Sequence, residues 1–179
     1  TDECIAVANG LDALYLIMRA YREMGIMQDG DEIIVPANTY IATILAITEN
    51  GLKPILIEPK LNTLQIDEDK IEEIITPKTK AILICNPNNP TGYLYSEEEM
   101  ETLRQIVLKH DIFLISDEVY REFCYEDAVH HSAMKLKGAE NNVILIDSAS
   151  KRFSACGIRI GRMITKNKDV LTAAMKYAQ

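Results

Sequence analysis

The chain alternates seven short runs rich in β-branched residues with segments that have helical spacing. Two runs, AILIC at 81–85 and VILID at 143–147, are apolar over nearly their whole length, which is typical of strands buried on both faces. Such strands need helices on both sides of the sheet, and strand–helix alternation supplies them. The pattern therefore predicts a three-layer α/β/α sandwich around a mostly parallel sheet, with strands at 4–8, 32–36, 54–58, 81–86, 113–117, 143–147 and 159–165.

The helical segments carry their own start signals. Apolar residues recur at helix spacing over 11–24, which predicts a helix directly after the first strand. Ser96 followed by Glu99 predicts a capping box at the start of a second long helix. Asp67 is expected to cap a helix over the isoleucines that follow it, and a last helix should follow Asn167.

Length and charge limit the class of protein. A chain of 179 residues suits one domain with a sizeable core. The net charge of −8 without a basic run argues against a nucleic-acid partner, and no apolar stretch approaches the ~20 residues that cross a bilayer. The four cysteines lack metal-binding spacing, so we expect no metal site and reduced thiols in a cytoplasmic protein. The sequence has no signal peptide and does not begin with methionine, which favours a fragment or a processed chain.

Polar residues follow five of the expected strands at the point where each ends. In open α/β sheets, ligands bind outside the carboxyl ends of the strands. We therefore expect these five segments to converge on one site. They are Asn9-Gly10, Asn38 to Tyr40, Asn86 to Gly92, Asp117 to Tyr120, and Ser148 to Lys151.

Lys151 and Arg159 are the two cations of this expected site. A lysine just past a strand end, beside hydroxyls and a second cation, suits a Schiff base with an aldehyde cofactor that carries a phosphate. Arg159 can hold a phosphate with two hydrogen bonds. The simpler interpretation is two solvated surface cations. Gly10 and Leu11 begin a helix whose free amides favour an anion, although Asn9 as an ordinary helix cap explains this segment equally well.

Aromatic and acidic residues could complete the site. Asp117 ends a buried strand, where its carboxylate could keep a pyridine nitrogen protonated, and Tyr120 could bond a phenolic oxygen. Asn89 lies in NPNNPTG, whose prolines and final glycine predict a rigid turn. Tyr40 could stack on a flat ring. Each feature also has a purely structural interpretation. Asp117 could be satisfied by the helix that follows it, with Tyr120 in the core. The NPNNPTG segment could be a plain loop, and Tyr40 could be an aromatic residue packed in the core.

Taken together, NPNNPTG, SDEVY and SASKRFSACGIRIG resemble fold-type I aminotransferases that depend on pyridoxal 5'-phosphate (PLP). The second half, from about residue 81 to 179, is similar to class I enzymes that act on amino acids. The first half, including CIAVANGLDALYLIMRAY and GDEIIVPANTYIATILAITENG, is more similar to DegT/StrS-type nucleotide-sugar aminotransferases. The type of aminotransferase that the sequence resembles changes near Lys80, which is consistent with natural divergence or with a recombined or designed chimera.

The resemblance assigns a role to each residue. It implies Lys151 as the Schiff-base lysine and proton shuttle, and Asp117 as the partner of the pyridine nitrogen. Asn89 and Tyr120 would contact the phenolic oxygen. By the same resemblance, Tyr40 stacks on the ring, and the backbone of Gly10 and Leu11 binds the phosphate together with Ser148 and Arg159. The family often has serine or threonine where Leu11 stands, so one phosphate contact is expected to be missing.

The resemblance also implies an architecture. The family's large domain has seven strands in the order 3-2-4-5-6-7-1, the seventh antiparallel, and residues 1–179 account for that single domain. The N-terminal arm and C-terminal small domain are expected to be absent, and with them the arginine that binds a substrate carboxylate. Whole enzymes of the family are homodimers, and this chain is expected to self-associate.

Three functions remain open at this stage. The first is a PLP-dependent aminotransferase that takes a small-molecule amino donor and acceptor, either amino acid or nucleotide sugar. The second is a non-catalytic PLP-binding fragment or chimeric scaffold. The third is another fold-type I activity, such as a decarboxylase or lyase, because shared cofactor residues do not decide the reaction.

Overall fold

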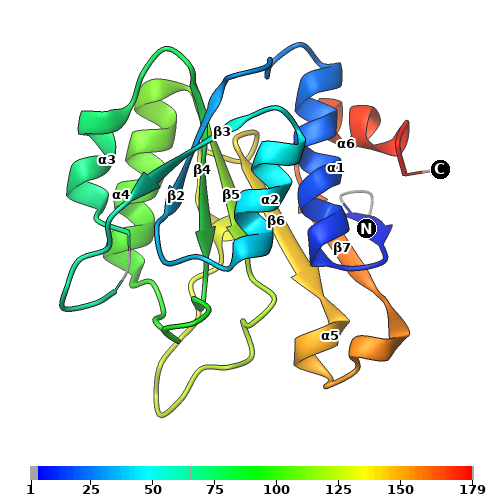
Figure 1. Cartoon of the computed structure of the whole chain (residues 1–179). Coiled ribbons are helices and arrows are strands. Elements are labelled where there is room, and N and C mark those ends of the chain that lie inside the picture. The colour runs from blue at the N-terminus through cyan, green and yellow to red at the C-terminus, as the bar shows by residue number, and fades with distance from the viewer. Residues whose placement is uncertain (1–3, 65, 179) are drawn as a thin grey trace.

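The seven apolar runs form the strands of one sheet, which lies between two layers of helices (Figure 1). The computed structural model describes residues 4–64 and 66–178. In chain order its elements are β1 (Cys4–Val7), α1 (Gly10–Glu23), β2 (Glu32–Pro36), α2 (Ile41–Glu49), β3 (Lys53–Ile57), α3 (Glu68–Ile74), β4 (Thr79–Cys85), α4 (Glu97–His110), β5 (Phe113–Asp117), η1 (Ala133–Lys135), β6 (Val143–Ser148), α5 (Ala149–Arg152), η2 (Cys156–Ile158), β7 (Gly161–Thr165) and α6 (Lys168–Met175).

The sheet has the order β1-β7-β6-β5-β4-β2-β3. Neighbouring strands from β3 to β6 pair in parallel, whereas β7 is antiparallel to both β6 and β1. The strand order and the single reversed strand that the resemblance implied are therefore confirmed. Since β2, β4, β5 and β6 all run the same way, their carboxyl ends meet at one edge of the sheet.

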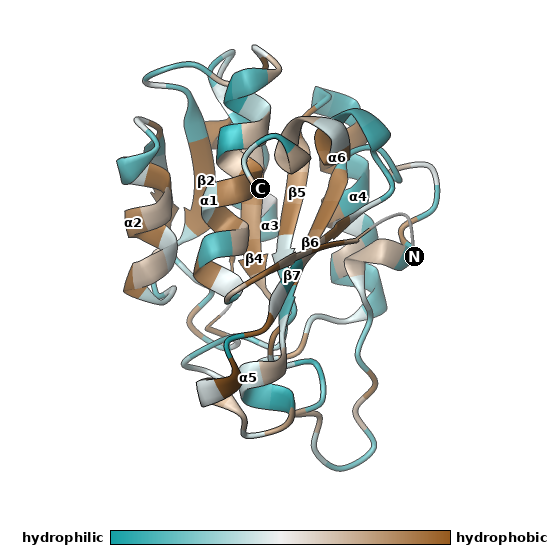
Figure 2. Cartoon of the chain, turned by 90° about the vertical axis from the view of Figure 1, so that its right-hand side faces the viewer, coloured by the Kyte–Doolittle hydropathy of each residue, from teal (hydrophilic) through white to brown (hydrophobic). Residues whose placement is uncertain are grey.

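Alternate residues of each strand supply two separate cores. Along β4, Ala81 and Leu83 join the core formed with α1, α2 and α6, whereas Ile82 and Ile84 join the core formed with α3 and α4. This period of two explains why the run is apolar throughout. Figure 2 shows the strands at the centre largely in brown, and it also shows much of α2 in brown, where Ile41 and Leu45 are exposed.

The helix starts follow the sequence signals with one difference. Ser96 and Glu99 form the expected capping box: the Ser96 hydroxyl accepts from the Glu99 amide at 3.1 Å, and the Glu99 carboxylate accepts from the Ser96 amide at 2.7 Å. Asp67 occupies the cap position of α3, but its carboxylate makes no cap bond and pairs with Lys70 at 2.8 Å instead. Within the described ranges, no helix is long and apolar enough to cross a bilayer.

At Gly161, β7 comes very close to the turn between β1 and α1. A Cβ built on Gly161 would lie 2.5 Å from the carbonyl carbon of Asn9 and 2.7 Å from its carbonyl oxygen. Real Cβ atoms do not approach backbone so closely, so a glycine is required there.

We expect Gly161→Ala to lower the free energy of unfolding by about 3 kcal/mol, the upper part of the usual range for overpacking. Urea denaturation followed by circular dichroism measures the change. Gly157→Ala is the matched control, because nothing lies within 4 Å of a Cβ built on Gly157. Equal stability of the two variants would contradict the close approach.

Candidate active site

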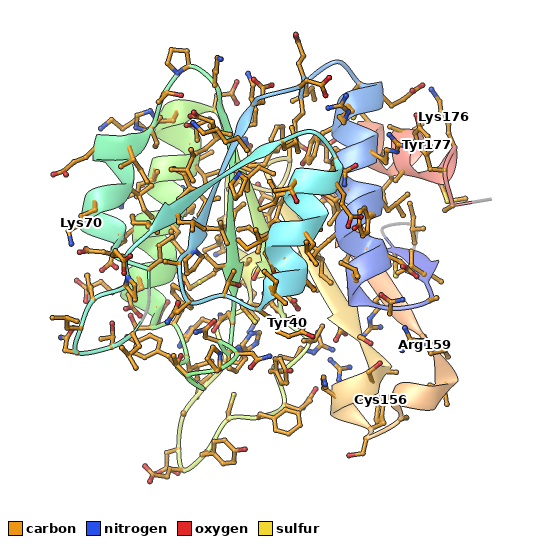
Figure 3. The ribbon with its side chains drawn as sticks, viewed as in Figure 1. Tyr40, Lys70, Cys156, Arg159, Lys176 and Tyr177 are labelled. Atoms are coloured by element: carbon orange, nitrogen blue, oxygen red, sulfur yellow. The ribbon has the colours of Figure 1, made fainter. Side chains whose placement is uncertain are left out.

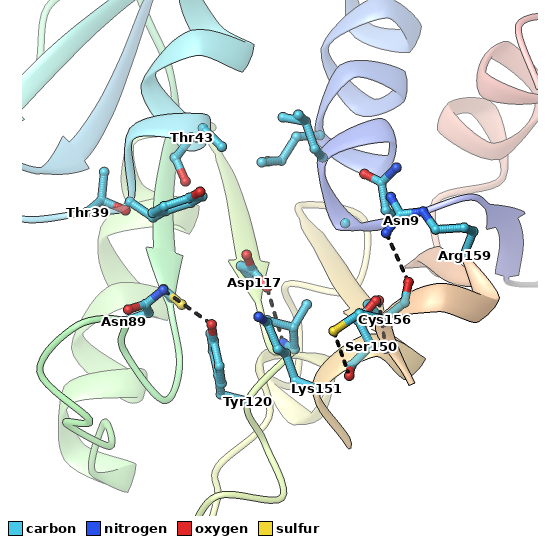
Figure 4. Close-up of a pocket in the computed structure, with 18 residues that line it drawn as sticks. Asn9, Thr39, Thr43, Asn89, Asp117, Tyr120, Ser150, Lys151, Cys156 and Arg159 are labelled. Carbon is cyan, nitrogen blue, oxygen red and sulfur yellow. Dashed lines mark hydrogen bonds between the residues drawn. The ribbon is translucent and has the colours of Figure 1, made fainter. Parts of the chain in front are cut away.

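A cavity of about 510 Å³ opens at the carboxyl ends of the parallel strands (Figure 4). Residues from the ends of β4, β5 and β6 meet there with the starts of α1 and α2. All nine residues singled out in the sequence line this cavity: Gly10, Leu11, Tyr40, Asn89, Asp117, Tyr120, Ser148, Lys151 and Arg159. The expected convergence of strand ends is therefore observed.

The two cations of the cavity come from the segment between β6 and β7. Lys151 lies on the short helix α5, with its Nζ 5.8 Å from the centroid of the Tyr120 ring. Arg159 follows η2 and donates to the Cys156 carbonyl at 3.2 Å. Figure 3 shows Arg159, Cys156 and Tyr40 at the same end of the molecule. In the described part of the chain, no carboxylate forms an ion pair with Lys151 or Arg159, so both charges are available to a ligand.

Asp117 is the acid that lines the cavity. It is the last residue of β5, and one carboxylate oxygen accepts a hydrogen bond from the Val119 amide at 3.1 Å. The pKa of Asp117 is raised to about 6, chiefly by burial; the bond from the Val119 amide opposes the shift, and the nearby carboxylate of Asp147 adds to it. A carboxyl group held in this way gains stability from a cationic ligand group, because a positive neighbour favours its ionised form.

Asn89 and Tyr120 are joined across the cavity. The Asn89 side-chain amide donates to the Tyr120 hydroxyl at 3.2 Å. The turn that presents Asn89 is closed by Gly92, whose φ of +73° and amide bond to the Asn88 carbonyl (2.8 Å) require the glycine that the sequence provides. Both polar groups thus lie in position to contact one oxygen of a ligand.

The start of α1 contains both an ordinary helix cap and residues that line the cavity, in keeping with the two interpretations that its sequence allowed. Asn9 caps the helix, with its side-chain oxygen accepting from the Asp12 amide at 3.0 Å. Gly10 and Leu11, the first residues of α1, line the cavity at the positive end of the helix dipole. Leu11 contributes no hydroxyl, as its residue type dictates.

The side chain of Ser148 is buried and already hydrogen-bonded. It is 5% exposed and caps α5, with its Oγ accepting from the Ser150 amide at 3.2 Å. The same oxygen is 3.1 Å from the Ile160 carbonyl and 3.0 Å from the Ser150 hydroxyl. Ser148 must exchange one of these partners to contact a ligand.

Thr39, Val119 and Ser150 also line the cavity, and they lie within the segments that were expected to converge, although none was singled out as a site residue. Sequence reasoning missed Thr43 and Cys85. Cys85 is the last residue of the apolar strand β4, and its residue type gave no separate signal. No group of three or more histidine, cysteine or acidic residues is arranged to hold a metal ion in the ranges that the structure describes.

Glu118 follows Asp117 in the chain and is fully buried. One of its oxygens accepts from the Ala133 amide at 2.8 Å and from the Ser132 and Ser116 hydroxyls, both at 3.2 Å. The second oxygen has no hydrogen-bond partner among the described residues, and it lies 3.5 Å from His130 Nε2. Burial raises the pKa of Glu118 from about 4.5 to about 7.

This shift predicts a pH-dependent stability. Between about pH 4.5 and 7 the native state binds the proton more tightly than the unfolded state, so the free energy of unfolding falls as pH rises. Glu118→Gln removes the ionisation, and we expect its stability relative to the parent chain to improve by about 3 kcal/mol from pH 4.5 to 8. Urea titrations at several pH values measure the difference; the exposed Glu98→Gln is the control. A difference in the free energy of unfolding that stays constant across this pH range would argue against a raised pKa of the buried Glu118 carboxyl group.

Comparison with known proteins places this cavity in a family. The family model for aminotransferases of class I and II matches residues 3–179. The chain belongs to this family. The aspartate aminotransferase of Bacillus subtilis is 32% identical over 179 residues, 99% of this chain and 44% of the relative. The dTDP-3-amino-3,6-dideoxy-alpha-D-galactopyranose transaminase of Aneurinibacillus thermoaerophilus is 51% identical over 115 residues, 64% of this chain and 29% of the relative.

Solved aminotransferases share the fold. The aromatic aminotransferase of Pyrococcus horikoshii superposes with a TM-score of 0.91 at 27% identity, covering 98% of this chain and 46% of that one. The chain thus spans less than half the length of these class I and II relatives. The family depends on PLP. The residues present fit that cofactor: the cavity offers a lysine and an arginine without acidic partners among the described residues, and a carboxyl group that a cationic ring would stabilise.

Proposed function

We propose that the chain is the PLP-binding large domain of an aminotransferase. One observation carries the proposal: nine residues from five separate segments, chosen for cofactor chemistry, line a single cavity. PLP supplies a reactive aldehyde carbon and a ring that accepts electrons. The chain's own residues must bind the phosphate, orient the ring and move protons.

The phosphate would lie at the start of α1. The amides of Gly10 and Leu11 and the helix dipole attract an anion there. Arg159 adds a full positive charge that no carboxylate of the described chain neutralises. Ser148 would contribute its hydroxyl after giving up the Ile160 carbonyl or Ser150.

The ring would be held between polar groups at opposite edges. Asp117 would face the ring nitrogen and keep it protonated, which lowers the pKa of the carboxyl from its raised value. Tyr120 and Asn89, already bonded at 3.2 Å, would hold the phenolic oxygen. Tyr40, 60% exposed at the start of α2, would cover one face of the ring.

Lys151 would carry the catalytic amine. Its Nζ would hold the cofactor covalently. As a free amine it would serve as the base that takes and returns the proton of the substrate carbon that bears the amino group. Tyr120, whose ring centroid is 5.8 Å from Nζ, would limit the positions that the amine visits.

The substrate class and origin are finer proposals. The 51% match of part of the chain to a sugar transaminase and the 32% match of 99% of the chain to an aspartate aminotransferase support a chain of mixed ancestry, natural or recombined. We propose an amino donor and acceptor of small size, either amino acids or amino sugars.

The cell location and the assembly state are separate proposals. Four free cysteines support a reducing, cytoplasmic location. Exposed Tyr40, Ile41 and Phe153 support self-association as a homodimer.

A non-catalytic PLP-binding domain is the second candidate. Lys151 and Arg159 are the only cations among the described residues that line the cavity, and both are assigned to the cofactor. That leaves none for a substrate carboxylate, which favours binding without turnover by this chain alone.

Mixing the PLP-loaded chain with amino donors distinguishes these candidates. L-Aspartate, L-glutamate, an aromatic amino acid and a dTDP-amino sugar are the donors to test. An aminotransferase converts the cofactor to pyridoxamine 5'-phosphate, which chromatography detects together with the keto product. Cofactor attached to Lys151 but unchanged by every donor would favour the non-catalytic domain, and no attachment at all would refute the proposal.

A further inference from the structure

The helix that carries Lys151 has no hydrophobic anchor. α5 spans only Ala149–Arg152, and none of its residues is buried. Apolar packing fixes most short helices in proteins, since four residues cannot form a stable helix alone. Backbone contacts give some support, such as the Ala149 amide bonded to the Ile160 carbonyl at 3.0 Å. Something else must hold α5 in one orientation.

Asp147, the residue before Ser148 in β6, supplies that anchor. It is 1% exposed, and one of its oxygens receives the guanidinium groups of three arginines. Arg152 of α5 donates Nη2 at 3.1 Å, Arg162 of β7 donates Nε at 2.9 Å, and Arg121 approaches to 3.6 Å. Arg162 Nη2 also bonds this oxygen. One carboxylate thus joins the end of β6 to three other segments.

The other oxygen of Asp147 accepts from the Ser148 amide at 2.8 Å. Ser148 in turn caps α5, so the carboxylate holds the helix at both ends: through Ser148 at the start and through Arg152 at the finish. Arg152 adjoins Lys151 in sequence. A tie on Arg152 therefore restricts the backbone from which the lysine projects.

The energetics favour a rigid tie. A buried carboxylate is unfavourable unless cations and hydrogen bonds compensate its lost hydration, and charge-assisted bonds are stronger than neutral ones. Arg152 Nε also lies 3.2 Å from a carboxylate oxygen of Glu122, an ion pair without hydrogen-bond geometry, so the hydrogen bond from Arg152 Nη2 to Asp147 is the tie on its guanidinium. Loss of one partner leaves the others charged and partly dehydrated, which drives local rearrangement.

We propose that Asp147 is a positioning residue for Lys151, clamping α5 to β6 through Arg152 so that the lysine amine points into the cavity. The inference rests on the proposed role of Lys151. It assigns no direct contact with the cofactor to Asp147, which acts through Arg152 and Ser148. A purely structural salt bridge would instead support the fold without affecting how the lysine reacts.

Two substitutions and two matched controls separate these interpretations. Asp147→Asn keeps the shape and the Ser148 bond but removes the charge, and Arg152→Gln removes the tie on α5. Glu32→Gln changes a buried carboxylate at the opposite edge of the sheet. Arg104→Gln breaks an arginine–carboxylate pair within α4. Arg152→Gln carries the test if Asp147→Asn fails to fold by circular dichroism.

Three measurements apply to each variant. The first is the rate at which added PLP becomes attached to Lys151, followed by visible absorbance. The second is the affinity for pyridoxamine 5'-phosphate, which has the same ring and phosphate but no aldehyde to react with lysine. The third is amide hydrogen exchange of residues 149–153 in the cofactor-free chain.

We expect Asp147→Asn and Arg152→Gln to slow attachment by about tenfold to a hundredfold, the usual effect of a small misplacement. Affinity for pyridoxamine 5'-phosphate should change by less than about threefold, as for substitutions away from a contact. Exchange in α5 should accelerate, and both controls should match the parent chain.

An unchanged attachment rate in Arg152→Gln would overturn the proposal. The proposal would also be overturned if the attachment rate and the affinity for pyridoxamine 5'-phosphate fell together, since the substitution would then have disrupted the whole site. If the parent chain never attaches PLP, the proposed function fails. The positioning of Lys151 for reaction fails with it, and hydrogen exchange then tests the clamp alone: faster exchange in α5 supports a clamp on the helix by Asp147, and unchanged exchange refutes it.

Discussion

Lys151→Ala should abolish the visible absorption that appears when PLP is added to the chain. Lys151 is the lysine that lines the cavity, and its side-chain amine is the nucleophile that the proposal requires. Alanine cannot bond the aldehyde carbon, so the expected loss is complete rather than graded. Absorbance titration measures it, and reduction with borohydride followed by peptide mass spectrometry locates the attached cofactor.

Lys168→Ala is the control for this prediction. Lys168 begins α6, is exposed and lies outside the cavity. Its variant should bind PLP like the parent chain. If Lys151→Ala kept the absorption band, another lysine would be the attachment site and the assignment of Lys151 would be wrong.

Asp117→Asn should slow amino-group transfer by about 10²–10³-fold, the usual cost of removing one electrostatic group from a reacting centre. Asparagine preserves the size of the side chain and can still accept from the Val119 amide. It cannot supply the negative charge that keeps a ring nitrogen protonated. Attachment of PLP to Lys151 should persist, so stopped-flow absorbance after mixing with an amino donor isolates the loss. In a chain that proves non-catalytic, PLP affinity replaces the transfer rate as the readout.

Asp111→Asn makes the same change at the other end of the molecule. Asp111 is the cap residue that follows α4, and its φ of 50° lies in the left-handed region, which asparagine tolerates. This control should behave like the parent chain. Equal rates in the two variants would show that the charge of Asp117 plays no part in the reaction.

Local sequence patterns predicted the elements of the fold well but did not by themselves give the order of strands. The run from Ala81 to Cys85 is apolar because both of its faces are covered, and this is readable from composition alone. The position of β7 between β1 and β6 depends on contacts between distant segments. That order was available only through the resemblance.

The cavity residues were predictable for a related reason. Lys151, Asp117 and Asn89 each stand at a strand end, and parallel strands bring their ends together whatever the residues between them. The clamp around Asp147 was not predictable, because Arg121, Arg152 and Arg162 look like ordinary surface charges in sequence. Only the structure shows that they share one buried carboxylate. Asp67 gives a smaller example, since Lys70 competed for the carboxylate that a cap would use.

The antiparallel strand β7 has a consequence for synthesis on the ribosome. β1 pairs with β7, and Cys4 lies opposite Ile164, about 160 residues later in the chain. Of the seven strands of this sheet β1 is made first, but it can pair only after β7 has been made, whereas β2 to β6 can associate earlier. Because Gly161 of β7 also packs on Asn9, the cavity wall at the start of α1 would be the last part of the site to become ordered during translation.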